Sequence, residues 1–295
     1  MPGQELFLLT GAGGAVGSTA NHAARQLLER KLPVRAFVHR ADRRAEELSA
    51  LGAEIVVGDL RDLETVRRAM RGVKRAYFSY PIAEGLLEAT TVFAAAGKEA
   101  GLEAIVNMSQ MAARPDHLSP SSRHHWLAER IFDWSGIGVT HVHLSFFMET
   151  FIKFSAETIR TQSKILLPYG QGRHAPVAGE DVGRVIVAVL LDPGPHRGKT
   201  LFLTGPRSFS IAEMAEVFSR VLGKPVQYVD IPVGRWREIL APKMPPYFLD
   251  HITAIADAYQ RGELDGVSDV VQRIGGSPPK PLDAFIAEHR TEFAG

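Results

Sequence analysis

The chain has 295 residues, of which 45% are hydrophobic and 23% charged, the balance of a globular protein with a sizeable core. A net charge of +1 gives no sign of a nucleic-acid-binding surface, and the lack of cysteine excludes disulfides, thiolate catalysis and cysteine–zinc sites. The longest apolar stretch, residues 185–191, is far shorter than the roughly 20 residues that span a bilayer. Since the first predicted strand begins at residue 6, we expect no signal peptide, no membrane association and a cytoplasmic location.

Strand-like and helix-like segments alternate regularly along the first half of the chain. The predicted strands are residues 6–9, 34–38, 53–57, 75–79, 104–109 and 139–145. The predicted helices between them cover about residues 18–28, 42–50, 62–71, 85–100 and 121–135, with Asp42, Asp62 and either Ser121 or Ser122 as caps. This alternation is typical of an α/β fold, and we expect a Rossmann-type doubly wound parallel sheet.

Beyond residue 145 the alternation loosens. Helices are predicted at residues 146–162 and 181–191, extended segments at 165–169 and 200–204, and mostly helix from 210 to 295. We therefore expect a dinucleotide-binding Rossmann domain of residues 1–145, to which residues 176–205 return, and a smaller, mostly helical substrate lobe made of residues 206–295 with 146–175.

A glycine-rich turn lies between the first strand and the first helix. Its spacing, Thr10-Gly11-x-x-Gly14-x-x-Gly17, differs from that of the fingerprint G-x-G-x-x-G. Glycines let the backbone approach a pyrophosphate, and the free N–H groups of the helix N-terminus face the anion. We predict a dinucleotide site here, a plain tight turn being the alternative. The expected cofactor contacts are Thr10, Gly11, Gly14, Ala15, Val16 and Gly17.

The end of the second strand bears on which nucleotide binds. In dinucleotide folds an acid at this point bonds the ribose 2′-hydroxyl, whereas a base accommodates a 2′-phosphate. Here the strand ends in His39-Arg40, and the planar guanidinium of Arg40 suits a phosphate. We expect NADP(H) in preference to NAD(H); the alternative is a solvated basic helix start. Beyond the third strand, Asp59 and Leu60 are expected beside the adenine, with a turn role for Asp59 as the alternative.

An ordered series of motifs extends over nearly the whole chain. The motifs are Thr10-Gly11-x-x-Gly14-x-x-Gly17, Val38-His39-Arg40, Gly58-Asp59-Leu60, Val106-x-x-Ser109, His125-x-x-x-Glu129, Glu180-Asp181-Val182-Gly183 and Leu203-Thr204-Gly205-Pro206 followed by Ser210-x-x-Glu213. The series resembles the NmrA-like branch of atypical short-chain dehydrogenases/reductases. That resemblance implies an NAD(P)-binding domain with a small C-terminal substrate lobe. Members include quinone and triphenylmethane-dye reductases, aromatic-polyketide tailoring enzymes, and redox-sensing regulators that bind the cofactor without turnover.

The position of the usual acid catalyst holds other residues. Most of the superfamily carries Tyr-x-x-x-Lys on the helix after the fifth strand, and no tyrosine of this chain has a lysine four residues later. Anchored on Glu129, Ser121 falls at the tyrosine position and His125 at the lysine position. His125 resembles the histidine of quinone and dye reductases of this family, which implies a role in orienting the nicotinamide ribose or supplying a proton. A structural hydrogen bond is the alternative for His125.

Residues after the later strands are expected around the nicotinamide and the substrate. Ser79, Tyr80, Ser109, His125 and Phe146 are predicted cofactor contacts. An aromatic pocket for a flat substrate is predicted from Met111, Trp126, Phe147, Met148 and Tyr169, each of which alone is more often a core residue. No metal site is expected, because His141 and His143 share a strand face without a carboxylate cluster and His124 and His125 diverge on a helix.

Two functions follow from these observations. The first is an NAD(P)H-dependent oxidoreductase that transfers a hydride to a quinone-like or polycyclic aromatic substrate, with a polyketide-tailoring reductase or oxygenase-type enzyme included. The second is a non-catalytic NADP-binding redox sensor that acts on a protein partner. We expect no nucleic-acid partner, and the sequence leaves a homodimer open.

Overall fold

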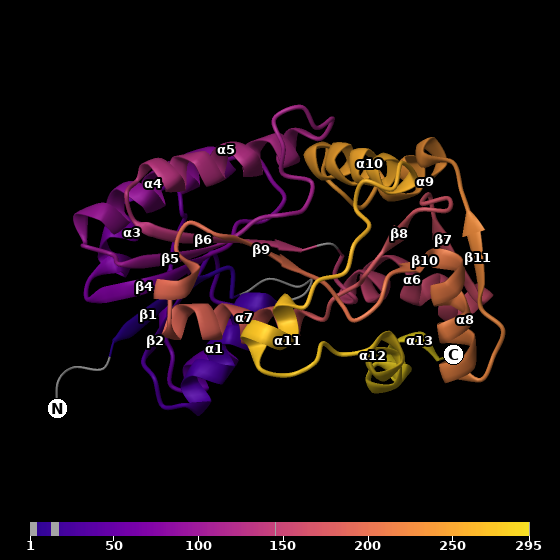
Figure 1. The fold of residues 1–295 in the computed structure, drawn as a ribbon, viewed down its shortest axis with the longest axis horizontal. Helices are drawn as coiled ribbons and strands as arrows, with labels where there is room; N and C mark the ends of the chain where they lie inside the picture. The colour runs from indigo at the N-terminus through magenta and orange to yellow at the C-terminus, as the bar shows by residue number, and fades with distance from the viewer. Residues whose placement is uncertain (1–4, 13–17, 145, 295) are drawn as a thin grey trace.

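The computed structural model describes residues 5–12, 18–144 and 146–294. Within them, seven strands form a parallel sheet in the order β3-β2-β1-β4-β5-β6-β9 (Figure 1). These strands are β1 (Leu6–Thr10), β2 (Val34–Val38), β3 (Glu54–Val57), β4 (Val73–Phe78), β5 (Ala104–Met108), β6 (Gly138–Leu144) and β9 (Thr200–Leu203). The chain runs outward from β1 in both directions, so the predicted doubly wound Rossmann-type sheet is confirmed.

Helices cover both faces of this sheet, because successive side chains of a strand point to opposite faces. Phe7 and Leu9 of β1 pack in one cluster and Leu8 in the other. The Phe7 face is covered by α1 (Thr19–Glu29), α2 (Arg43–Ala50), α7 (Gly179–Leu191) and α11 (Val270–Gly275). The Leu8 face is covered by α3 (Leu63–Met70), α4 (Leu86–Glu99) and α5 (Pro120–Trp134), the upper layer in Figure 1.

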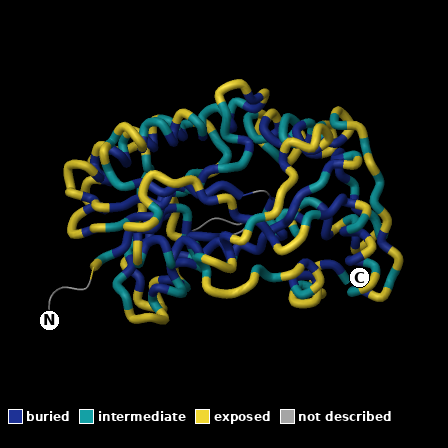
Figure 2. Tube along the Cα trace, viewed as in Figure 1, coloured by how far each residue is buried: buried dark blue, intermediate teal, exposed yellow. Residues whose placement is uncertain are grey.

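A third hydrophobic cluster forms beyond the carboxyl ends of the strands, and Figure 2 shows buried residues in both parts of the molecule. Phe151 and Phe218 are fully buried in it, with ring centroids 5.3 Å apart. We call this part the C-terminal lobe. It contains α6 (Glu149–Gln162), β7 (Lys164–Leu167), β8 (Arg173–His174), β10 (Phe209–Ser210), α8 (Ile211–Leu222), β11 (Gln227–Asp230), α9 (Val233–Leu240), α10 (Pro246–Gln260), α12 (Leu282–Glu288) and α13 (Arg290–Phe293). A 3₁₀ turn, η1 (Gly194–His196), precedes β9.

The predicted helix starts are correct at Asp42 and Asp62, whose carboxylates accept backbone N–H groups of the first turn. The prediction of Ser121 or Ser122 as the cap of α5 is wrong. Ser119 caps that helix, and Pro120 follows at its first position, where the missing N–H loses no helical hydrogen bond.

The helix predicted from residue 146 begins only at Glu149. Phe146 and Met148 instead form backbone hydrogen bonds with Val177, of 2.8 and 3.0 Å, and these hold the segment extended. In the described ranges no helix has the length and apolar character needed to cross a membrane.

Candidate functional site

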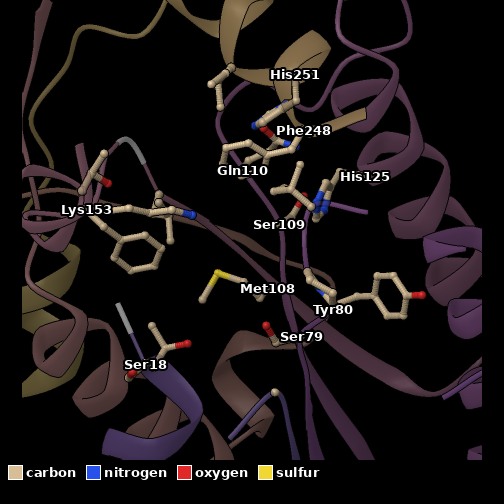
Figure 3. Close-up of a pocket in the computed structure, with 18 of the residues that line it drawn as sticks. Ser18, Ser79, Tyr80, Met108, Ser109, Gln110, His125, Lys153, Phe248 and His251 are labelled. Atoms are coloured by element: carbon tan, nitrogen blue, oxygen red, sulfur yellow. The ribbon is translucent and has the colours of Figure 1, made fainter. Parts of the chain in front are cut away.

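A cavity of about 900 Å³ lies at the carboxyl ends of the sheet strands and continues into the C-terminal lobe (Figure 3). Because all seven strands are parallel, the residues that follow them meet at one edge of the sheet. The predicted cofactor residues that line the cavity are Gly11, Arg40, Asp59, Leu60, Ser79, Tyr80, Ser109, His125 and Phe146. The predicted contacts of Gly14, Ala15, Val16 and Gly17 lie outside the described residues.

The ends of β1 and β4 are joined through one hydroxyl group. Thr10 Oγ1 donates to the Ser79 carbonyl (2.9 Å) and accepts from the Ser79 N–H (2.8 Å). Thr10 is fully buried and does not line the cavity, and its hydroxyl supports the Ser79 backbone from behind. The neighbouring Gly11 has φ +77°, and a Cβ there would lie 3.2 Å from the Ser79 side chain. Glycine is therefore needed next to this hydroxyl bridge.

Charged side chains surround the cavity at the ends of β2 and β3; we call His39, Arg40, Asp42, Arg44, Asp59 and Arg61 the sheet end. Arg44 and Arg61 bond the carboxylates of Asp42 and Asp59, each with an N–O distance of 2.6 Å. The hydrogen bonds from Arg61 lower the pKa of Asp59 to about 2. Arg40 is exposed and forms no ion pair with any residue that the structure describes. Its guanidinium is therefore available to an anion in the cavity.

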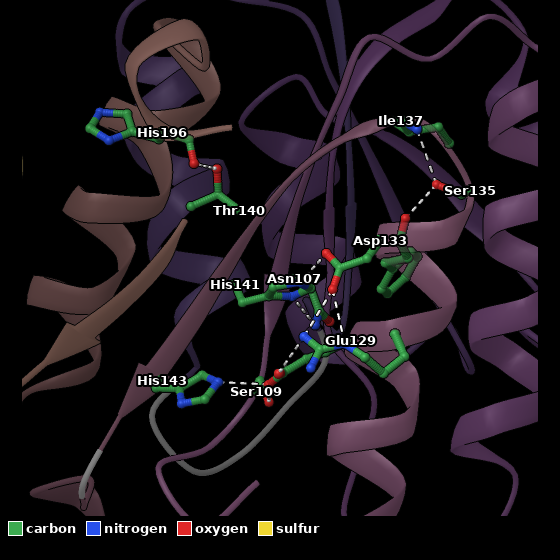
Figure 4. Close-up of polar contacts among 12 residues, drawn as sticks. Asn107, Ser109, Glu129, Asp133, Ser135, Ile137, Thr140, His141, His143 and His196 are labelled. Atoms are coloured by element: carbon green, nitrogen blue, oxygen red, sulfur yellow. Dashed lines mark hydrogen bonds and ion pairs between the residues drawn. The ribbon is translucent and has the colours of Figure 1, made fainter. Parts of the chain in front are cut away.

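Below the middle of the cavity, a buried carboxylate connects β5, β6 and α5 (Figure 4). Glu129 Oε1 accepts from Ser109 Oγ (2.5 Å) and from His143 Nε2 (2.6 Å). Burial alone would raise the pKa of Glu129, but these hydrogen bonds lower it below its usual value. Ser109 lines the cavity with its hydroxyl already donated to Glu129, so its position is fixed from behind.

A second buried contact lies beside the first one (Figure 4). His141 Nδ1 is 3.0 Å from the Asn107 side-chain nitrogen, and its Nε2 is 3.0 Å from Asp133 Oδ1. The two histidines of β6 thus have structural hydrogen-bond partners on β5 and α5. Among the residues that the structure describes, no group of three or more His, Cys, Asp or Glu side chains could hold a metal ion.

His125 lies in α5, one turn before Glu129, and its side chain lines the cavity (Figure 3). Burial lowers the pKa of His125 to about 4, outweighing the opposite influence of the Glu129 carboxylate. At neutral pH the imidazole is therefore uncharged and offers one N–H and one acceptor nitrogen.

His251 of α10 also lines the cavity, and the sequence analysis did not single it out (Figure 3). Its Nδ1 lies 2.9 Å from Ser119 Oγ, which itself accepts the Ser122 N–H. Among the described residues no other acceptor is given for the Ser119 hydroxyl proton, so we assign this proton to Nδ1 and the imidazole proton to Nε2, the tautomer in which both groups are satisfied. Burial, with His125 and His117 nearby, lowers the pKa of His251 to about 3. His251 is thus a neutral ring whose Nε2–H is free to donate.

Aromatic side chains form the opposite end of the cavity; we call Phe154, Trp236, Phe248, Tyr259 and the adjoining Lys153 and His251 the lobe end. Of the predicted substrate residues, Met111, Phe147 and Tyr169 line the cavity. Met148 and Trp126 do not. Met148 is fully buried in the core of the lobe. Trp126 lies one residue along α5 from His125, about 100° around the helix, with its ring 5.7 Å from the Arg130 guanidinium.

A match to a protein-family model shows to which family the chain belongs. Residues 6–289 match the model of the NmrA-like family. The chain belongs to the NmrA-like family. The resemblance drawn from the ordered motifs is thereby confirmed.

Two curated proteins resemble this NmrA-like chain over almost their whole length. The NAD(P)H azoreductase of Xenophilus azovorans is 30% identical over 291 residues, which are 98% of this chain and 99% of the relative. A (4-alkanoyl-5-oxo-2,5-dihydrofuran-3-yl)methyl phosphate reductase of Streptomyces griseus is 30% identical over 295 residues, with coverage of 98% and 99%.

The fold of this NmrA-like chain is shared with solved structures. An NADPH-dependent quinone oxidoreductase of Escherichia coli, solved in complex with NADPH, superimposes with a TM-score of 0.84 at 21% identity, covering 97% of this chain and 99% of the other. At this identity the likeness concerns the fold alone.

Several of the site residues missed from the sequence come from the C-terminal lobe, and others, such as Arg61 and Gln110, follow strands of the sheet. Lys153 belongs to α6, Trp236 to α9, and Phe248 and His251 to α10. A signal existed in the helical spacing of Phe248, His251, Ile252 and Ile255, which all line the cavity from one face of α10. That spacing also fits a core-facing helix, so the cavity could be recognised only from the folded chain.

Proposed function

We propose that this protein is an NAD(P)H-dependent oxidoreductase that reduces a quinone-like or other electrophilic aromatic substrate, with NADP(H) preferred to NAD(H). The observation that carries the proposal is that one continuous cavity extends from Arg40 at the sheet end to Trp236 at the lobe end. A nucleotide and a flat aromatic molecule can therefore lie in contact within one site. The two relatives at 30% identity, the NAD(P)H azoreductase and the (4-alkanoyl-5-oxo-2,5-dihydrofuran-3-yl)methyl phosphate reductase, are both reductases and support this reaction class.

The residues at the strand ends fit a dinucleotide. Gly11 leaves space for close approach of a pyrophosphate, and Arg40 has the unpaired guanidinium that suits a 2′-phosphate. Asp59 and Leu60 line the adenosine side, and Ser79, Tyr80 and Ser109 line the nicotinamide side. A bound dihydronicotinamide would supply the hydride, which is the chemistry that the protein itself cannot provide.

Two neutral histidines flank the space next to the nicotinamide side. Since the sequence lacks the Tyr-x-x-x-Lys pair, we assign the hydrogen bond to the substrate to His251 Nε2–H. A donor at this point stabilises negative charge that develops on a quinone oxygen as the hydride arrives. His125 orients the cofactor or substrate as a neutral ring, because its pKa of about 4 leaves it uncharged near pH 7. Positioning and exclusion of water then do most of the catalysis.

A substrate panel tests the proposal. The purified protein is mixed with NADPH and, in separate assays, quinones, azo dyes, triphenylmethane dyes and aromatic polyketides, and the nicotinamide absorbance is followed. We expect turnover with at least one of these acceptors, and the pattern identifies the acceptor class. Tight NADP(H) binding without turnover on any acceptor would overturn the proposal in favour of a redox sensor.

A further inference from the structure

Lys153 is a basic residue within the otherwise mainly aromatic lobe end. It belongs to α6, between Thr150 and Phe154, and all three residues line the cavity. Figure 3 shows its side chain extending into the cavity, with the ammonium nitrogen at the tip. Its charge therefore faces the space assigned above to the substrate.

Aromatic rings, and not carboxylates, surround this ammonium group. Lys153 Nζ lies 4.6 Å from the ring centroid of Phe248 and 5.3 Å from that of Phe154. No carboxylate of the described residues comes within ion-pair distance, whereas Arg44 and Arg61 at the sheet end are paired at 2.6 Å. Partial burial lowers the pKa of Lys153 from its usual value without any opposing carboxylate.

A cavity cation in this state is suited to bind an anion. The two rings stabilise the ammonium weakly and hold it in place, while an oxyanion would restore the interactions it has lost with water. Among the described residues that line the cavity, two cations thus have no carboxylate partner, Arg40 at the sheet end and Lys153 at the lobe end. If Arg40 meets a phosphate of the cofactor, Lys153 remains for the substrate.

We propose that Lys153 forms a subsite for an oxyanion carried by the aromatic substrate, a carboxylate, sulfonate or phosphate. Phe154 and Phe248 lie against the aromatic body of the same molecule. This inference deepens the proposed function, because it names the substrate class as anionic aromatic compounds. It also makes a statement about binding that holds without any turnover.

A binding experiment tests the subsite separately from the reaction. Naphthalene-2-sulfonate, naphthalene-2-carboxylate and 2-naphthyl phosphate are titrated calorimetrically into the NADP⁺-saturated protein, with the uncharged 2-naphthalenemethanol as the matched probe. We expect the anions to bind more tightly than the alcohol. Lys153→Met should weaken the anions by about 10- to 100-fold and leave the alcohol within twofold. Lys153→Arg should retain most of the affinity, and Lys199→Met, an exposed lysine outside the cavity, should change nothing.

Several results would overturn the proposal. The first is that the wild-type protein binds the anions and the alcohol with equal affinity. The second is that Lys153→Met weakens binding of the anions and of the alcohol equally. The third is that the anions displace NADP⁺ instead of binding beside it. Circular dichroism of each variant shows whether its fold is retained. If Lys153→Met does not fold, the comparison of Lys153→Arg with Lys153→Gln on the same four probes decides.

A second assay separates this inference from the proposed function. NADPH oxidation is compared with 1,4-naphthoquinone and with 1,4-naphthoquinone-2-sulfonate, and each variant is referred to wild type on the same quinone. Lys153→Met should raise KM for the sulfonate at least about 10-fold more than it raises KM for the neutral quinone. Equal effects on both quinones count against the subsite. If the wild-type protein reduces neither quinone, the result counts against the proposed function. The calorimetric result for Lys153 would still hold.

Discussion

The two ends of the cavity hold their titratable groups in opposite ways. At the sheet end, Asp42 and Asp59 are each paired with an arginine, and the contact with Arg61 lowers the pKa of Asp59 to about 2. In the C-terminal lobe, burial lowers the pKa of His251 and of His174 to about 3. His174 is surrounded by Phe146 and Tyr259, with ring centroids 4.5 and 4.7 Å away. Neither of its ring nitrogens has a partner among the described residues.

A low pKa therefore has two meanings in this molecule. Asp59 is kept charged by an ion pair, whereas the histidines are kept neutral by burial. The proposed function places the nucleotide at the sheet end, where the charge is fixed, and the aromatic molecule at the lobe end, where the rings are neutral and Lys153 is the one charge among the cavity residues described. Acid should weaken the two regions over different pH ranges.

The largest effect is expected at Glu129, in the buried network that supports Ser109 of the cavity wall. Glu129→Ala leaves the buried donors of Ser109 and His143 without their acceptor, which should lower the free energy of unfolding by about 4 kcal/mol. Urea unfolding at pH 7 measures it. Arg130→Ala is the control, because Arg130 is a half-exposed partner at 3.6 Å. A loss no larger than the control would mean that this network does not support the site.

At the lobe end, substitution of His251 removes the Nε2–H that we propose as the hydrogen-bond donor to the substrate. His251→Leu should lower kcat by about 100-fold, the effect of losing one donor to a developing oxyanion. His251→Gln should retain part of the wild-type kcat, because its amide can donate a hydrogen bond from a similar position. Ser119→Ala should lower kcat less than His251→Leu does, because it removes only the hydrogen bond that orients the His251 ring. Steady-state NADPH oxidation measures all three. An unchanged kcat in a folded His251→Leu variant would remove His251 from the mechanism.

At the sheet end, Arg40 should decide between the two nicotinamide cofactors. Arg40→Ala should raise the Kd of NADPH by about 30-fold, through loss of a charge-assisted contact, and leave that of NADH within twofold. Arg43→Ala serves as the control, since Arg43 pairs with Glu47 and does not line the cavity. Calorimetric titration gives both constants. Equal losses for NADPH and NADH would place the 2′-phosphate elsewhere.

The smallest effect concerns pH and His174. Between its folded pKa of about 3 and an unfolded value near 6.5, the unfolded chain binds more protons, so stability falls as the pH falls through this range. One such histidine lowers the free energy of unfolding at pH 5 by up to about 2 kcal/mol relative to its value at pH 7. His174→Leu should reduce the loss between pH 7 and pH 5 by that amount in urea unfolding.

The sheet end supplies the matching control for His174. Asp59→Asn should change the pH dependence only below about pH 4, because the folded pKa of Asp59 is about 2 and its unfolded value is near 3.8. If both variants changed stability over the same pH range, the contrast between the two regions would be wrong.

The sheet and its edge could be predicted from sequence because they depend on local patterns. Short apolar segments alternate with helices, and a parallel arrangement brings Gly11, Arg40, Asp59 and Ser79 to one edge by geometry alone. The motifs at these strand ends belong to the ordered series that resembles the NmrA-like family. Among the predicted cofactor residues that the structure describes, Thr10 lies behind the cavity wall, where its hydroxyl bonds the Ser79 backbone.

The lobe end could not be predicted in the same way. Lys153, Trp236 and His251 meet because three helices pack on a shared core, and sequence separation gives no measure of that packing. Met148 is predicted to line the pocket because it follows the sixth strand, and Trp126 is added as part of the aromatic set. Backbone pairing with Val177 directs Met148 into the core, and the helical rotation of about 100° per residue takes Trp126 away from His125.

The hydroxyl bridge between Thr10 and Ser79 has a consequence for binding. It spans β1 and β4, the two strands at which the chain reverses its direction across the sheet. The width of the crevice at this switch point is thus set by covalent and hydrogen-bonded protein atoms before any nucleotide enters. A ligand that binds between these two strand ends would meet a preformed spacing, so ordering Thr10 and Ser79 would cost it little conformational entropy.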